Sequence, residues 1–347
     1  MKLRKIAVLA SALILALNGY GQDQEEDTEL RLTRLEALAG RIKLGGWLDF
    51  AYADNDIKGQ QDFFNVQHVY LNFDISINQH WLAFVEIEYE NLPETGTSEE
   101  DDGRIILDRG YIEYRYHAGA RFQMGKFSTP AGIWKPEHWA VTTDATLEPI
   151  MEQLEFIPDK SVGLQFLGTR ETPSGSLEYA VIFTNGAEAS NTRGRNGADG
   201  LGGDVSFRFP KRGMLGFSYH RLEDDRDELE TSEYGWMLYG ELNIVPQKLM
   251  ARSEFLSYEK PDNANARTGY VKLKWSFHER LYANIRFDYA AFEGHEEGVD
   301  RQQTEALTLG YWPHPRVRIK AEMARTHYDG STLDDFREWS AWIGLTF

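Results

Sequence analysis

Apolar and polar residues alternate along most of the chain after position 40. In one such segment Val69, Leu71 and Phe73 alternate with Tyr70 and Asn72. Successive side chains of a β-strand point to opposite faces of a sheet, so this period of two predicts strands with one apolar and one polar face. Sixteen segments with this pattern are expected to form strands, at residues 40–54, 65–78, 80–91, 104–117, 119–128, 160–170, 175–186, 201–210, 213–223, 232–245, 248–259, 267–278, 280–293, 303–313, 315–328 and 335–347.

The connections between these segments alternate in length. Every second connection is a tight turn, such as Pro246–Gln247 or Pro313–His314, whereas the others are longer and mostly acidic, such as 91–103. A membrane barrel carries short turns on its periplasmic rim and long loops on its outer rim, and a soluble β-sandwich has no reason to sort its loops in this way. The sequence therefore predicts an all-β fold, a transmembrane antiparallel β-barrel of about 16 strands over residues 40–347.

Residues 1–21 have the pattern of a secretory signal. Three basic residues precede an apolar run from Ile6 to Leu17, and the small residues Gly19 and Gly21 occupy the positions expected before a cleavage site. We expect a signal peptide that is removed after Gly21, rather than an uncleaved anchor helix. Residues 22–39 are acidic, with leucines near helical spacing, and predict a short N-terminal periplasmic segment before the barrel.

The composition agrees with an exported chain and argues against some partners. The mean hydropathy is -0.51, there is no cysteine, and no stretch after residue 20 has the about 18 continuous apolar residues of a membrane-spanning helix. Removing the three basic residues of the signal from 37 leaves 34 against 55 acidic residues, a net charge of -21. This charge argues against a nucleic-acid partner, because phosphate binding requires a basic surface.

The chain ends in a segment with the same alternation of apolar and polar residues. Trp339, Ala341, Ile343 and Leu345 occupy alternate positions, and the last residue is Phe347. This ending resembles that of outer-membrane porins, which typically finish with such a strand and a terminal aromatic residue. The resemblance implies that Phe347 is an assembly signal for the barrel assembly machinery. It also implies export through the periplasm to the bacterial outer membrane, with its lipid and lipopolysaccharide as partners.

The polar positions of the strands are expected to face inward, because hydrocarbon cannot solvate charge. Twelve basic and ten acidic residues fall at these positions, so the lumen is nearly balanced in charge and is expected to be wet. Sixteen strands also enclose too wide a space for side chains to fill. The basic residues expected to line the pore are Arg109, Arg115, Arg121, Lys272, Lys274, Arg286, Arg316, Arg318 and Lys320.

The segment 128–160 is the longest connection and the third outer loop. It combines many carboxylates with more apolar residues than an exposed loop should have. A long loop of this kind usually packs against another part of the protein. We expect it to bend into the barrel and narrow it, with its carboxylates opposing the basic wall so that the transverse field sets ion preference. The alternative is a loop that lies over the rim or packs on a neighbouring subunit. The constriction residues are expected to be Trp134, Glu137, Asp144, Glu148 and Glu152.

The sequence around the start of this loop, Met124–Gly132, resembles the phosphate-selective porin O/P family. Leu147–Ile150 and Ser161–Leu164 lie about where that family's loop returns to the wall. The resemblance implies a sixteen-stranded channel, commonly a homotrimer, with phosphate among the anions that pass. Phosphate selectivity in that family depends on a pathway dense in arginine and lysine, whereas here basic and acidic residues are interleaved.

These features together predict a porin, a water-filled channel for passive diffusion of small polar solutes and ions. The alternatives are an outer-membrane enzyme of the lipase or protease type and a structural or adhesive barrel without a conducting pore. The chain has no His-Glu-x-x-His motif and no phosphate-binding P-loop, so we expect no enzyme activity, cofactor or metal site. The acidic runs Glu99–Asp102 and Glu223–Asp225 are expected to be solvated loops, with divalent cations that bridge lipopolysaccharide as the alternative.

Overall fold

A computed structural model describes residues 40–57, 63–90, 104–117, 119–137, 139–186, 199–224, 231–259, 265–293, 299–330 and 333–347. The expected signal peptide, the N-terminal segment and the acidic run Glu99–Asp102 lie outside these ranges, as does Asp225. The described residues form the strands β1 (Ile42–Asn55), β2 (Phe63–Ser76), β3 (Trp81–Glu90), β4 (Arg104–His117), β5 (Ala120–Ser128), β6 (Lys160–Thr172), β7 (Gly175–Thr184), β8 (Gly200–Phe209), β9 (Gly213–Asp224), β10 (Thr231–Val245), β11 (Leu249–Glu259), β12 (Asn265–His278), β13 (Leu281–Glu293), β14 (Arg301–His314), β15 (Val317–Asp329) and β16 (Phe336–Thr346). Two short helices, α3 (Trp134–Glu137) and α4 (Ile150–Gln153), lie between β5 and β6.

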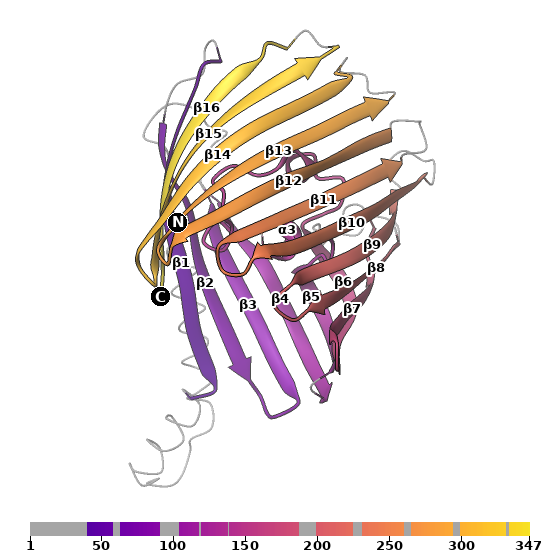
Figure 1. Ribbon diagram of the computed structural model, residues 1–347. Coiled ribbons are helices and arrows are strands. Elements are labelled where there is room, and N and C mark those ends of the chain that lie inside the picture. Colours follow the sequence, from indigo (N-terminus) through magenta and orange to yellow (C-terminus); the bar gives the residue numbers. More distant parts are fainter. Residues whose placement is uncertain are drawn as a thin grey trace, which may run out of the picture. The chain divides into compact units, whose positions relative to one another are not determined.

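The strands form one closed antiparallel barrel in which each strand pairs with its neighbours in sequence (Figure 1). The ring closes where β1 pairs with β16, from Trp47 opposite Thr346 to Asn55 opposite Glu338. All sixteen strands occur where the alternation predicts them, and their ends differ from the predicted ends by two residues at most. The predicted fold class is therefore confirmed.

The two faces of the barrel wall differ as the period of two requires. On β13 the side chain of Ile285 points outward and is 63% exposed, whereas the next residue, Arg286, points inward and is 1% exposed. Large apolar side chains such as Leu215, Leu238 and Phe287 continue the outward face on other strands. This apolar outer surface suits hydrocarbon, and the charged inner surface does not. Among the described residues, no helix is both long and apolar enough to cross a bilayer.

The last residue is part of the seam that closes the barrel. The Phe347 backbone N–H donates a hydrogen bond to the Gly46 carbonyl at 3.0 Å, and the Gly46 N–H donates to the Phe347 carbonyl at 3.3 Å. A Cβ at position 46 would lie 2.7 Å from the Phe347 ring and 2.2 Å from the Tyr70 carbonyl, so only glycine fits there. The role of Phe347 as an assembly signal stays a prediction.

The third loop lies within the ring of strands, with α3 visible inside the barrel (Figure 1). Its apolar side chains, among them Trp134, Met151 and Ile157, form a buried cluster with inward-facing residues of β10, β11 and β12 such as Met237 and Tyr270. The apolar content of this segment is therefore explained by packing on the inner wall. The hydrophobic core of the protein is asymmetric, since this cluster covers only one side of the lumen.

Candidate functional site

Glu254 of β11 holds the start of the third loop. Its carboxylate accepts hydrogen bonds from the backbone N–H groups of Ile133 at 2.7 Å and Trp134 at 2.9 Å, and from the Tyr270 hydroxyl at 2.5 Å. The preceding Gly132 has a φ of +70°, and a Cβ there would lie 2.0 Å from the Glu254 carboxylate. Only glycine combines this left-handed backbone with so close an approach. The loop therefore turns onto the wall at one required glycine.

Asp144 ties the middle of the loop to two strands. Its carboxylate accepts hydrogen bonds from Lys274 at 2.8 Å, Arg318 at 3.0 Å and Lys272 at 3.4 Å. Burial alone would raise the pKa of Asp144, but the three cations outweigh it and hold the pKa far below its usual value. A single ionised side chain of the loop thus compensates part of a buried cluster of cations from β12 and β15.

Other buried cations of the wall bind carbonyl groups of the loop. Arg286 donates a hydrogen bond to the Leu147 carbonyl at 2.7 Å, and Lys320 donates to the carbonyls of Ala140 at 2.7 Å and Ala145 at 2.6 Å. A buried cation without such partners would strongly destabilise the fold. The loop backbone therefore replaces the water that these side chains would otherwise need.

The loop also reaches the wall at β4, away from the strands that hold its middle. The Arg109 guanidinium lies 4.2 Å from the centre of the Trp139 ring and forms an ion pair with Glu86 at 2.8 Å. The next loop residue, Ala140, contacts Lys320 on β15. Because β4 and β15 are separated by β16, β1, β2 and β3 in the ring, the loop extends across the interior between two distant parts of the wall.

A buried ion-pair cluster joins the two ends of the loop. Lys135 of α3 lies 2.8 Å from the Glu152 carboxylate of α4 and 2.6 Å from that of Asp159. Burial raises the pKa of Glu152 to about 7, and this effect outweighs the opposing influence of Lys135. Burial would lower the pKa of Lys135, but Glu152 and Asp159 together raise it. The cluster holds the loop together internally, whereas Asp144 holds it to the wall.

Of the other predicted constriction residues, two are exposed at the edge of this packing and one is buried within it. Glu137 pairs with Arg252 of β11 at 2.9 Å while its side chain stays 48% exposed. Glu148 is exposed, and its backbone carbonyl accepts a hydrogen bond from Arg286 at 3.4 Å. Trp134, by contrast, is buried in the apolar cluster. The predicted set therefore divides into residues that pack the loop and residues that remain open to solvent.

The inner wall at β4 and β5 carries accessible cations. The side chains of Arg115 and Arg121 are 49% and 39% exposed, and both lie near the Glu113 carboxylate, at 2.5 Å and 3.8 Å. Glu113 itself is only 2% exposed and also accepts a hydrogen bond from Gln123 at 2.6 Å. A solute at this wall meets two guanidinium groups, whereas the carboxylate that partly neutralises them lies beneath.

The structure divides the nine predicted pore-lining cations into three groups. The first lies against the third loop and is partly or fully buried, and it comprises Lys272, Lys274, Arg286, Arg318, Lys320 and, beneath Trp139, Arg109. Arg115 and Arg121 form the accessible group. Arg316 lies in the turn between β14 and β15 and not in a strand, although its carbonyl accepts a hydrogen bond from the Thr346 N–H at 2.9 Å.

The expectation of a wet lumen needs a correction on the side that the loop covers. Lys272, Arg286 and Lys320 point inward as predicted, yet their side chains are almost fully buried. Inward charge on this side is compensated by ion pairs and carbonyl groups in addition to any water. Sequence reasoning assigned no role to Glu254 or Lys135, because strand periodicity shows which residues face inward but not which loop atoms they meet. Among the described residues, no cluster of His, Asp or Glu side chains is arranged to hold a metal ion.

Comparison with known proteins identifies the fold. No family model and no curated protein sequence matches the chain. Solved structures do match. An anion-selective porin from Comamonas acidovorans has a TM-score of 0.64 at 13% identity, covering 88% of this chain and 99% of that one. The outer membrane channel DcaP of Acinetobacter baumannii has a TM-score of 0.62 at 9% identity, covering 88% and 97%.

A third similar structure is OmpT in its trimer form, an outer membrane protein of Vibrio cholerae. Its TM-score is 0.58 at 10% identity, and the match covers 88% of this chain and 99% of that one. The chain has a porin fold. At these identities the comparisons show the fold alone, and the narrower resemblance to the phosphate-selective porin O/P family stays a prediction.

Proposed function

We propose that the protein is an outer-membrane porin through which small polar solutes and ions diffuse passively. The observation that carries the proposal is the asymmetric lumen. The third loop packs on the inner faces of β10 to β13 and β15 and reaches β4 at Arg109, while the short-turn ends of β4 and β5 keep the exposed side chains of Arg115 and Arg121. Charged side chains that stay exposed inside an apolar outer wall indicate a solvated passage. The third loop is the constriction of that passage.

The proposed channel prefers anions, and phosphate is one candidate solute. The exposed cations at the short-turn ends of β4 and β5 are Arg115 and Arg121, and their common partner Glu113 is buried beneath them. A charged side chain that is exposed in the passage sets ion preference more strongly than a buried one, because a passing ion comes closer to the exposed charge. The exposed carboxylate of Glu137 on the loop opposes this preference, so the selectivity is expected to be moderate.

The proposal includes the location and assembly of the protein. Residues 1–21 direct export, Phe347 serves the barrel assembly machinery, and the mature protein lies in the outer membrane in contact with lipid and lipopolysaccharide. A homotrimer is the proposed assembly, supported by the trimer form of one protein with a similar fold. Chemical cross-linking of the folded protein in native membranes tests the trimer, since it should stop at three copies.

The decisive experiment is electrical recording of the purified protein in planar bilayers. Stepwise conductance is expected, with a reversal potential in a KCl gradient that shows preference for chloride. A complete absence of current steps would contradict the porin proposal and favour a structural or adhesive barrel. Release of fatty acid from added phospholipid, absent from a heat-denatured sample, would instead favour an outer-membrane enzyme.

A further inference from the structure

The outward face of the wall contains a depression where large side chains are expected. The cross-strand registers place Leu215 of β9, Gly240 of β10, Ser253 of β11 and Val271 of β12 in one row. All four positions belong to the outward-facing set, since Leu215 and Val271 are exposed and residues of the same parity flank them. The two central positions of the row, Gly240 and Ser253, therefore have small side chains or none, while the two ends have the larger side chains of Leu215 and Val271.

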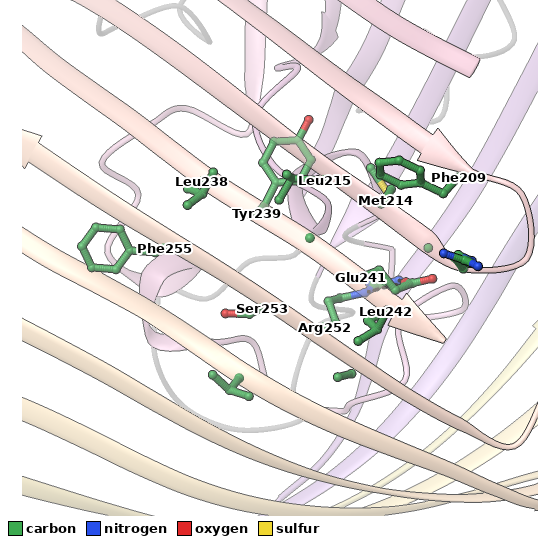
Figure 2. Close-up of a pocket in the computed structure, with 15 residues that line it drawn as sticks. Phe209, Met214, Leu215, Leu238, Tyr239, Glu241, Leu242, Arg252, Ser253 and Phe255 are labelled. Atoms are coloured by element: carbon green, nitrogen blue, oxygen red, sulfur yellow. Dashed lines mark hydrogen bonds and ion pairs between the residues drawn. The ribbon is translucent and has the colours of Figure 1, made fainter. Parts of the chain in front are cut away.

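The neighbouring rows enclose this gap along the strand direction. Leu238 lies opposite Phe255 on the side of the long loops, and Leu242 lies opposite Ala251 on the side of the short turns. Figure 2 shows Leu238, Phe255 and Leu242 around the short side chain of Ser253. The result is a groove of about 600 Å³, with small residues along its floor and apolar side chains around it. Since strands rise about 3.3 Å per residue, the three rows extend over roughly 13 Å.

The groove ends at a cationic group on the short-turn rim. Arg212, in the turn between β8 and β9, lines this end together with Phe209 and Gly213. The adjacent Lys211 is also exposed. Short turns of outer-membrane barrels lie at the periplasmic interface, where phospholipid headgroups meet the wall. A basic residue at this level can pair with an anionic headgroup.

We infer that this groove is a binding site for a phospholipid of the periplasmic leaflet. One acyl chain lies over Gly240 and Ser253, between Leu215 and Val271, and the headgroup phosphate pairs with Arg212. The small residues of the floor leave room for the chain, the apolar side chains around them contact it, and the position of Arg212 selects an anionic lipid over a neutral one. The site lies on the outside of the wall, so it does not depend on the proposed channel activity.

Charge and shape favour a lipid over a second copy of this chain. Two further charged residues line the groove, Glu241 and Arg252, and they pair with each other at 2.8 Å. Arg212, exposed in its turn, is the cation at the end of the groove and suits a phosphate rather than another basic turn. The depression is about two residues wide between protruding leucine and valine side chains, and a stable protein interface needs roughly 800 Å² of surface on each partner. A single flexible acyl chain fits these dimensions better than a folded surface.

Native mass spectrometry of the folded, delipidated protein tests the site. Phosphatidylglycerol and phosphatidylcholine are added separately, and the lipid retained per chain is counted. Ala251→Leu narrows the groove, and Ala321→Leu makes the same change on the outward face of β15 between Leu309 and Ala341. We expect phosphatidylglycerol retention to fall about tenfold in Ala251→Leu and to be unchanged in Ala321→Leu.

Arg212→Gln tests the headgroup contact without altering the groove floor. It should remove the preference for phosphatidylglycerol over phosphatidylcholine while leaving heat-modifiable gel migration, a sign of the folded barrel, unchanged. Equal lipid retention by Ala251→Leu and Ala321→Leu would overturn the proposal. A change in oligomer mass in Ala251→Leu with lipid retention unchanged would also overturn it, and would assign the groove to a second copy of the chain.

Discussion

Two parts of the inner wall carry the same kinds of side chain but use them differently. On β12, β13 and β15, lysine and arginine side chains such as Lys272, Arg286 and Lys320 are buried beneath the third loop. At the short-turn ends of β4 and β5, the side chains of Arg115 and Arg121 stay 49% and 39% exposed. The first part is a contact surface for the loop, and the second is the part of the wall that we propose a solute meets.

The difference teaches that an inward-facing cation is not by itself a pore-lining residue. Removing one partner from a buried ion pair destabilises a fold strongly, because the remaining charge is left without compensation. A half-exposed pair contributes little to stability, because water compensates each charge separately. We call the part on β12, β13 and β15 the covered wall, and the part at Arg115 and Arg121 the open wall. Substitution on the covered wall should therefore change the position of the loop, and substitution on the open wall should change ion preference.

Asp144→Asn is expected to have the largest effect. The change keeps the shape of the side chain but leaves Lys272, Lys274 and Arg318 without their shared carboxylate. Breaking a buried ion pair in this way typically destabilises by about 3–5 kcal/mol. The loop should leave the wall, so single-channel conductance should rise and become noisy, and the loop should become sensitive to protease.

Glu137→Gln is the matched control for this prediction. Glu137 is also an acidic loop residue paired with a wall arginine, but its side chain is half exposed. Its loss should change loop stability by less than about 1 kcal/mol. Equal conductance in Asp144→Asn and the unsubstituted protein would contradict the view that the covered wall holds the loop.

Gly132→Ala should have the next largest effect. A Cβ at this position would require a left-handed backbone and would collide with the Glu254 carboxylate that binds the loop. Strain of this kind is worth about 1–3 kcal/mol. Hydrogen exchange at Ile133 and Trp134 should speed up accordingly. Gly203→Ala is the control, because a Cβ there meets only the Ala180 carbonyl at 3.5 Å, and it should leave exchange at both amides unchanged.

Neutralising the open wall should alter selectivity without moving the loop. Arg115→Gln combined with Arg121→Gln removes both exposed cations, and an exposed unit charge acts on a nearby ion with about 1 kcal/mol. The reversal potential in a KCl gradient should therefore shift in the direction of greater potassium permeability. The expected shift corresponds to a few-fold decrease in the ratio of chloride to potassium permeability. Conductance noise should stay unchanged, since both side chains pair with Glu113 of the wall and no hydrogen bond or ion pair joins them to the described residues of the third loop.

Arg318→Gln combined with Lys320→Gln neutralises two cations of the covered wall and should have the opposite result, a change in conductance and noise. These side chains bind loop carbonyls and Asp144, so the expected result is greater conductance and noise. A pure shift of selectivity with unchanged noise would show that these cations line the passage, and would reverse the comparison between the two walls.

The fold could be predicted closely because the period of two is a local property of the chain. Each strand repeats it, and the short and long connections fix the order of pairing, so sixteen strand positions follow from sequence alone. Parity also places Lys272, Arg286 and Lys320 on the inner face. Local patterns of this kind suffice wherever one face meets hydrocarbon and the other does not.

The roles of those residues could not be predicted, because they depend on the path of the third loop. The contact between Asp144 and Arg318 joins positions 174 residues apart, and no period relates them. Sequence placed the carboxylates of the loop opposite a basic wall in general terms. It could not show that Asp144 is buried by the contact while Glu137 stays exposed, since that difference comes from tertiary packing.

The smallest expected effect is that of pH on the stability of the third loop. The pKa of Asp144 lies far below its usual value, so its stabilisation of the loop is fully present above about pH 4 and is lost only at much lower pH. The pKa of Glu152 is raised to about 7, so its contribution is fully present below about pH 4 and decreases as pH rises through 7. Between pH 8 and pH 6 the loop should thus become slightly more stable, and open-channel noise should fall slightly while mean conductance stays constant. Glu152→Gln should abolish this change and keep Lys135 paired with Asp159. A rise in noise on acidification to pH 6 would show that the position of the loop depends on a titrating group other than Asp144 and Glu152.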